Sequence, residues 1–129
     1  MMLTIALPTG RVFSDAVEMI AGAGLPCDGL ASPGRKLVIE AGEFRYILAK
    51  PSDVPLYVSY GTADLAFAGG DVLLESAMPV VELLDTGAGR CSVVVAGPRS
   101  QAERFRGHAS ELMGLKVATK YPRIADGHF

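Results

Sequence analysis

The sequence predicts an α/β protein built on a mainly parallel sheet flanked by helices. Short apolar runs typical of buried strands alternate along the chain with amphipathic segments typical of helices. Glycine, proline and small polar residues punctuate the junctions, as turns and helix ends require. Half of the 129 residues are hydrophobic and a fifth are charged, which is the composition of a globular domain.

The overall charge and the cysteines narrow the class of protein. The formal net charge is −2, so the overall charge does not favour electrostatic binding to nucleic acid. No apolar stretch is long enough to span a bilayer, and the first residues do not read as a secretory signal. Cys27 and Cys91 lie far apart without metal-type spacing. We therefore expect a cytoplasmic protein with reduced thiols and with neither nucleic acid nor membrane as a partner.

The first third of the chain predicts a strand, a helix and a hairpin. Residues 3–8 are a buried strand, and a turn follows. Ser14 can cap a helix, which the glycines of residues 21–26 end. Residues 33–50 predict two strands joined by a tight turn around Ala41–Gly42.

The middle of the chain predicts a helix, a strand and a second helix. Residues 52–61 form a short helix, with Ser52 as its cap and a proline in its first turn. Residues 63–69 are a buried strand, and residues 70–77 open a helix for which Asp71 is a natural N-cap.

The last third is more mixed. Residues 80–87, 91–98 and 115–120 are apolar enough to predict three strands. Residues 100–112 predict a polar helix, and residues 121–129 the beginning of another.

Two turns stand out as candidate ligand sites, at residues 8–11 and 68–71. Both follow an apolar strand and precede a helix, and parallel sheets bind ligands at the carboxyl ends of their strands. Gly10 lets the backbone bend, Arg11 could bind two phosphate oxygens, and free helix amides would add to the site. The alternative is an ordinary turn glycine beside an exposed arginine.

Other charged residues have two readings each. Arg35 and Lys36, directly before a strand, and Lys50 are either solvated charges or anion ligands. Asp64 begins an apolar strand, so its carboxylate must be exposed, paired or bound to a ligand. No catalytic triad, metal cluster or Walker-type loop is present. The residues alone indicate an α/β protein with an anionic small molecule as its candidate ligand.

Several motifs in a fixed order resemble the ATP phosphoribosyltransferase family, and most of all its short-form catalytic subunit. They are LTIALPTGRVF, PGRKLVI, KPSDVPLYVSYGTADLAFAGGDVLLE, ELLDTGAGRCSVVVAGP and LKVATKYPRIADGHF. The resemblance implies transfer of the phosphoribosyl group of phosphoribosyl pyrophosphate to N1 of ATP. Pyrophosphate leaves with Mg²⁺, in the first step of histidine biosynthesis. It also implies a separate regulatory subunit related to histidyl-tRNA synthetase.

The resemblance also implies a set of site residues. Arg11 and Arg35 would be catalytic, because arginines aimed at the leaving pyrophosphate stabilise its growing charge. Thr9 stands where the family usually carries a lysine. The residues expected to bind substrates are Thr9, Gly10, Lys50, Asp64, Gly69, Gly70, Asp71 and Asp85.

The implied fold is a type II periplasmic-binding-protein-like lobe. Residues 1–97 would form the first, nucleotide-side lobe, and residues 98–129 an incomplete start of a second lobe. No segment resembles the family's loop for the 5′-phosphate, so we expect this chain alone to be inactive or nearly so. Open sheet edges favour a homo-oligomer. A non-catalytic nucleotide-binding or subunit-assembly module is the alternative.

Overall fold

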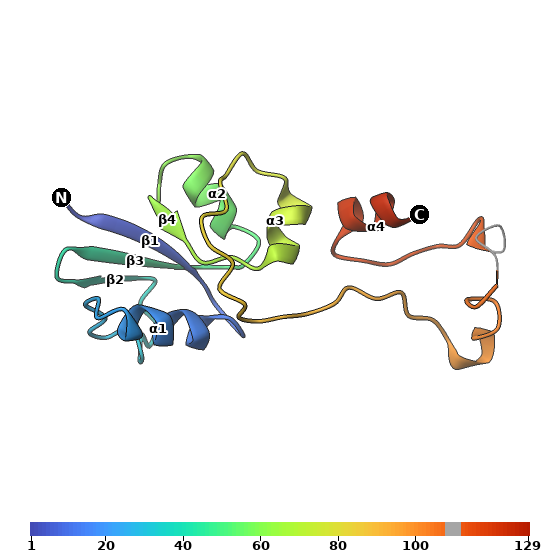
Figure 1. The fold of residues 1–129 in the computed structure, drawn as a ribbon, viewed down its shortest axis with the longest axis horizontal. Coiled ribbons are helices and arrows are strands. Elements are labelled where there is room, and N and C mark those ends of the chain that lie inside the picture. Colours follow the sequence, from blue (N-terminus) through green and yellow to red (C-terminus); the bar gives the residue numbers. More distant parts are fainter. Residues whose placement is uncertain (108–111) are drawn as a thin grey trace. The chain divides into compact units, whose positions relative to one another are not determined.

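The computed structural model describes residues 1–107 and 112–129, which divide into two compact units. One unit comprises Met1–Gly89 and the other Arg90–Phe129. The strands and the first three helices belong to the first unit (Figure 1). The lobe boundary expected after residue 97 stays a prediction.

The first unit is built on a four-stranded sheet with the order β2-β3-β1-β4 (Figure 1). The central strand β1 (Leu3–Pro8) runs parallel to both β3 (Phe44–Ala49) and β4 (Leu65–Ala66). The edge strand β2 (Val38–Ala41) runs antiparallel to β3, as the predicted hairpin requires. The predicted α/β class and the mainly parallel sheet are confirmed.

Helices cover both faces of this sheet, because alternate side chains of each strand point to opposite faces. Helix α1 (Phe13–Gly22) covers one face, and α2 (Val54–Ser59) covers part of the other. The buried core beneath α1 includes Ile5, Leu7, Ala16, Ile20, Tyr46 and Leu48. The smaller core beneath α2 consists of Ala6, Ala49, Val54 and Ala63.

The helices are where the sequence predicts them, but their predicted caps are wrong. Helix α1 has Val12 at its N-cap, so Ser14 lies within the first turn. Helix α2 has Asp53 at its N-cap, and Ser52 Oγ donates to Asp53 Oδ1 at 3.1 Å instead. Helix α3 (Gly70–Ser76) follows Gly69 as N-cap, which places Asp71 in its first turn. None of these three helix starts has a side-chain cap hydrogen bond.

The buried strand predicted over residues 63–69 is wrong in extent and in burial. Only Leu65–Ala66 forms β4, and both residues are exposed, Leu65 by 37%. Strand β4 lies at the edge of the sheet and pairs with β1 alone. Phe67, just beyond it, is half-buried and packs against the core beneath α1.

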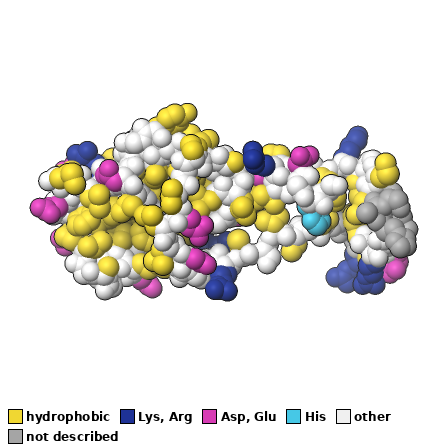
Figure 2. All heavy atoms as spheres, turned by 45° about the horizontal axis from the view of Figure 1, so that its top comes forward, with side chains coloured by type: hydrophobic (Ala, Val, Ile, Leu, Met, Phe, Trp, Pro, Cys, Tyr) yellow, Lys and Arg dark blue, Asp and Glu magenta, His cyan; other side chains and the backbone are white. Residues whose placement is uncertain are grey.

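The three strands predicted over residues 80–87, 91–98 and 115–120 are also wrong. These segments take neither strand nor helix conformation. Their apolar side chains stay exposed, among them Val81, Leu83, Leu84, Val93, Val94 and Val95. Figure 2 shows apolar side chains over much of the visible face of the molecule. An apolar run indicates side chains that favour burial, but a strand also needs a neighbouring strand to complete its backbone hydrogen bonds.

The predicted polar helix over residues 100–112 is only partly testable. A short 3₁₀ helix, η1 (Arg99–Gln101), begins there, and turns follow as far as residue 107. Residues 108–111, with His108, lie outside the described residues. Helix α4 (Pro122–His128) confirms the helix predicted at the end of the chain. In the described ranges, every helix is too short or too polar to cross a bilayer.

Candidate functional site

The two candidate turns lie at the same edge of the sheet. Strands β1 and β4 are parallel neighbours, so their carboxyl ends meet at one edge. Strand β3 ends there as well, because Pro8 pairs with Ala49 and Thr9 N donates to Ala49 O at 2.8 Å. This bond places Thr9 beside Lys50, the residue that follows β3.

Arg35 and Lys36 reach the same edge from the antiparallel strand. Because β2 runs against β3, the beginning of β2 lies beside the end of β3. Leu48 N donates to Leu37 O at 2.8 Å, which fixes this register one residue after Lys36. Residues 33–36 form a turn in which Lys36 N donates to Pro33 O at 3.0 Å. The predicted hairpin already implies this position for the basic pair.

Four cations therefore lie at the same end of the sheet, and we call them the basic row. Arg11 follows β1, Lys50 follows β3, and Arg35 and Lys36 precede the antiparallel strand β2. All four side chains are exposed, and none forms an ion pair in the part of the chain that the structure describes. By contrast, Arg45 Nη2 lies 2.8 Å from Glu40 Oε1. The basic row is thus a set of exposed cations suited to an anion.

The turn that carries Arg11 depends on a glycine. Gly10 has a φ of +96°, a backbone conformation that residues with a side chain rarely adopt. Space is not the constraint, because a Cβ at this position would meet nothing within 4 Å. Phe13 N donates to Gly10 O at 3.1 Å, and α1 begins directly afterwards without a side-chain cap. Backbone amides at such a helix start attract anions, although Asp15 adds a carboxylate to the same turn.

The glycine turn after β4 borders the site on its other side. Asp71 lies in the first turn of α3, and its carboxylate folds back against Gly69. A Cβ added to Gly69 would lie 2.5 Å from Asp71 Oδ1. At this edge, the β4 side therefore carries an acidic residue, whereas the other strands carry the basic row.

Asp64 lies at the beginning of β4, at the opposite end of the strands from the glycine turn that follows β4, and its expected contact with substrate stays a prediction. Thr4 N donates to Asp64 Oδ2 at 2.8 Å, and Asp64 N donates to Thr4 O at 2.9 Å. Both bonds form near the beginning of β1, whereas Gly69 follows β4. The carboxylate thus extends the pairing of β1 with β4. Of the three alternatives for Asp64, which were exposed, paired or bound to a ligand, the structure shows a carboxylate paired with a backbone amide.

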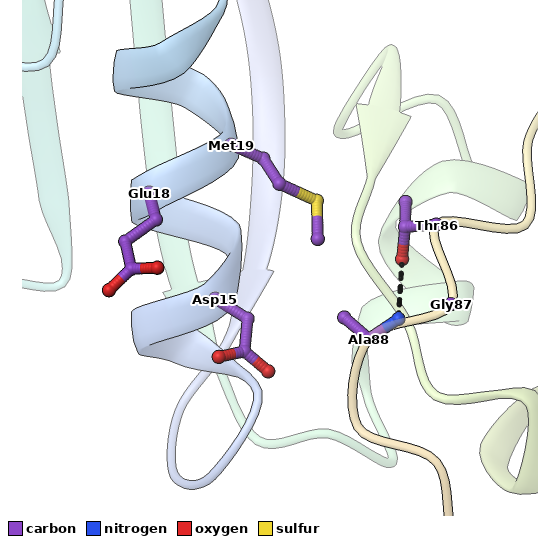
Figure 3. Close-up of a pocket in the computed structure, with 6 residues that line it drawn as sticks. All are labelled: Asp15, Glu18, Met19, Thr86, Gly87 and Ala88. Atoms are coloured by element: carbon purple, nitrogen blue, oxygen red, sulfur yellow. Dashed lines mark hydrogen bonds between the residues drawn. The ribbon is translucent and has the colours of Figure 1, made fainter.

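Asp85 belongs to a loop beside α1. Its Oδ1 accepts from Gly87 N at 2.8 Å, which forms a side-chain turn. A Cβ added to Gly89 would lie 3.1 Å from Val12 Cγ2, so this loop passes next to the residue after Arg11. A shallow hollow separates the loop from α1 (Figure 3), lined by Asp15, Glu18, Met19, Thr86, Gly87 and Ala88. Its two carboxylates make it unsuitable for phosphate.

The charged groups do not form a metal site of their own. Within residues 1–107 and 112–129, no three His, Cys, Asp or Glu side chains gather closely enough to hold a metal ion. Mg²⁺ often keeps several waters and binds substrate phosphates with few protein ligands. The described side chains therefore offer too few ligands to hold a magnesium ion by themselves.

Comparison with known proteins gives consistent matches. The family model described as HisG: ATP phosphoribosyltransferase matches residues 50–129. An ATP phosphoribosyltransferase of Rubrobacter xylanophilus is 45% identical over 130 residues, covering 98% of this chain and 59% of that protein. Another, of Sorangium cellulosum, is 46% identical over 130 residues, with 98% and 57% covered. The chain thus spans less than 60% of the length of these relatives.

A solved structure matches the fold as well. It is the ATP phosphoribosyl transferase (HisG:HisZ) complex from Thermotoga maritima, with a TM-score of 0.56 and 28% sequence identity. The match covers 64% of this chain and 39% of that one. Family model, relatives and structure all agree, and the chain belongs to the ATP phosphoribosyltransferase family.

Proposed function

We propose that this chain contributes the nucleotide-side residues of an ATP phosphoribosyltransferase acting in the first step of histidine biosynthesis. The observation that carries the proposal is the basic row at the carboxyl edge of the sheet. In the reaction, the bond between C1 of the ribose and the pyrophosphate oxygen breaks. A bond from N1 of ATP to C1 forms, and the bonding electrons leave with pyrophosphate.

The basic row suits this chemistry because the leaving group gathers negative charge in the transition state. Arg11 and Arg35 have guanidinium groups that can bind two phosphate oxygens at once. Lys50 adds a mobile ammonium beside Thr9. Thr9 offers a hydroxyl where the family usually has a lysine, and its backbone bond to Ala49 places Lys50 beside that position.

The remaining expected site residues have different roles. Gly10 shapes the turn, and Gly69, Gly70 and Asp71 line the side of the site at the end of β4. Asp85 shapes its own loop by accepting from Gly87 N. We assign Asp64 to holding β4 on β1 rather than to substrate contact.

Magnesium would reach this site with the substrate phosphates and would neutralise part of their charge. The chain's own contribution is to orient the phosphates with the basic row and with the backbone at the start of α1.

We further propose the assembly that the family resemblance implies. The first unit would be a type II periplasmic-binding-protein-like lobe, with a second lobe that begins near residue 98. The Thermotoga maritima structure is a HisG:HisZ complex, which supports a regulatory subunit as partner. A homo-oligomer and a cytoplasmic location complete the proposal.

Calorimetric titration of the chain with ATP and Mg²⁺, with and without phosphoribosyl pyrophosphate, tests this function. Binding is the readout, because the chain spans less than 60% of the length of its relatives. We expect saturable binding that Arg11→Ala weakens roughly tenfold, since a charge-assisted hydrogen bond is worth about 1.5–3 kcal/mol. Arg45→Ala is the control, because Arg45 pairs with Glu40 near the other edge of the sheet.

Two outcomes would contradict the proposal. One is no heat at millimolar ATP from a chain shown to be folded, which sets a limit of about −4 kcal/mol on the binding free energy. The other is equal weakening by Arg11→Ala and Arg45→Ala, which would reduce the basic row to surface charge.

A further inference from the structure

We propose that the outer edge of β2 is a contact surface for a second copy of this chain. The two β2 strands pair in antiparallel fashion about a twofold axis, so that the two sheets join into one continuous sheet. The inference goes beyond the catalytic part of the proposed function, and it gives the proposed homo-oligomer a defined surface.

Strand β2 is the longer of the two edges of the sheet. The order β2-β3-β1-β4 leaves one side of β2 and one side of β4 without a neighbouring strand (Figure 1). Strand β4 has only two residues, and a very short edge strand offers little to pair with. Strand β2 has four residues in unbroken register with β3 and contains no proline. A regular edge of this kind favours pairing with a further strand.

The register with β3 determines which backbone groups of β2 face outward. Leu48 N donates to Leu37 O at 2.8 Å, so these two residues form a hydrogen-bonded pair of the antiparallel ladder. Such pairs alternate with non-hydrogen-bonded pairs, so Val38 and Glu40 direct their amides and carbonyls away from β3. In residues 1–107 and 112–129, neither of these two amides donates a hydrogen bond. Both are therefore available to a second strand.

The charges of residues 36–40, KLVIE, complement themselves across such a pair. When the pair is centred on Val38, Lys36 lies opposite Glu40 of the second copy, and the twofold axis repeats this contact. Lys36 forms no ion pair with the described residues. Glu40 binds Arg45 through Oε1 alone, so its Oε2 can accept from a second cation. The smallest shift that keeps the outward groups facing would instead place Lys36 or Glu40 opposite Val38, so charge selects one register.

The same register provides the backbone hydrogen bonds. Val38 N of each copy meets Val38 O of the other, and Glu40 N meets Lys36 O of the other. Lys36 N is not needed, because it already donates to Pro33 O at 3.0 Å.

Exposed apolar side chains lie along this edge as well. Leu37 is 65% exposed and Val38 is 49% exposed. In the paired strands, Val38 lies against its own equivalent, and Leu37 lies opposite Ile39 of the second copy. Pairing therefore removes apolar surface from water, which favours association.

The backbone part of the inference is tested by sedimentation equilibrium, which gives the dissociation constant of the dimer. Val38→Pro removes the outward amide, and a proline is tolerated on an edge strand where its nitrogen faces away from the sheet. We expect it to raise the dissociation constant at least tenfold, the effect of about two lost hydrogen bonds. Val38→Ala keeps the amide and should raise it by about threefold or less.

The register is tested by two charge reversals that are mixed. Lys36→Glu alone places glutamates opposite each other, and Glu40→Lys alone places lysines opposite each other. Each should raise the dissociation constant roughly tenfold. An equimolar mixture of the K36E and E40K chains should recover the wild-type dissociation constant, because every glutamate then faces a lysine. Glu18→Lys, an exposed position on α1, is the control for net charge and should change nothing.

Three results would each overturn the inference. The first is a wild-type chain that sediments as a monomer at every concentration. The second is a dimer that a folded Val38→Pro chain leaves unchanged, which would mean that the copies meet through another surface. The third is a mixture of K36E and E40K chains that associates no better than either chain alone. Circular dichroism checks the fold of each variant, and if Val38→Pro does not fold, the mixture decides.

The inference and the proposed function fail separately. If ATP binding depends on Arg11 but the chain stays monomeric, nucleotide binding stands and the β2 surface is wrong. If the dimer responds to the variants as expected but ATP does not bind, the surface stands and the proposed function is wrong.

Discussion

Replacing Gly10 by alanine should destabilise the protein, whereas the same change at Gly70 should not. Both glycines lie in the turns of the candidate site, and a Cβ at either position would meet nothing within 4 Å. They differ in backbone conformation. Gly10 has a φ of +96°, whereas Gly70 is the first residue of α3 and does not have a positive φ. The pair therefore isolates the effect of conformation from the effect of space.

The expected magnitudes follow from this difference. A left-handed conformation costs a residue with a side chain about 1–2 kcal/mol. Alanine also restricts the unfolded chain, which stabilises a variant by about 0.4–1 kcal/mol where its conformation fits. Gly10→Ala should thus lower the free energy of unfolding by roughly 1 kcal/mol, and Gly70→Ala should raise it by up to about 1 kcal/mol, since alanine also favours a helix.

Urea denaturation measures both values. With a slope of about 1–2 kcal/mol per molar urea, the two midpoints should differ by roughly 1 M or more. Gly10→Asn should fall between wild type and Gly10→Ala, because asparagine adopts positive φ more readily. Midpoints that shift by the same amount and sign in the two alanine variants would refute the reasoning, since conformation would then not decide the outcome.

Two further predictions concern the core and the sheet. Tyr46 is fully buried and donates to Pro26 O at 2.6 Å, so Tyr46→Phe should cost about 1–2 kcal/mol by leaving this carbonyl unpaired. Burial, helped by Cys27, raises the pKa of Tyr46, so above pH of about 10 the unfolded chain releases this proton first. Wild-type stability should therefore fall as the pH rises further, and urea midpoints should show a shallower fall in Tyr46→Phe. Asp64→Ala should lower the free energy of unfolding by about 1–2 kcal/mol by removing the acceptor for Thr4 N, and unchanged urea midpoints would contradict this role.

The parts of the fold that were predictable depend on local signals. Residues 3–8 are apolar and end in a proline and a glycine turn, so β1 was evident from its own composition. The hairpin of β2 and β3 was predictable because Gly42, with a φ of +58°, separates two partly alternating runs. By contrast, residues 91–98 have the composition of a strand but lack a partner, and pairing is a property of the whole fold.

The candidate site shows the same division. Arg11 and Gly10 were found from one turn, whereas the position of Arg35 depends on β2 running against β3. Asp64 and Gly69 are close in sequence, but β4 lies between them. A residue before a strand and a residue after it lie at opposite edges of the sheet, so the order of Asp64 and Gly69 around β4 already contained the answer.

The basic row has a consequence for how fast an anionic ligand can find it. The chain as a whole carries a net charge of −2, so at long range it offers ATP no attraction. At physiological salt, charges are screened beyond about 8 Å. An anionic ligand is therefore attracted by the row only after diffusion has brought it close to the ends of the strands. Its association rate should be that of an unsteered encounter, and added salt should act mainly by speeding dissociation.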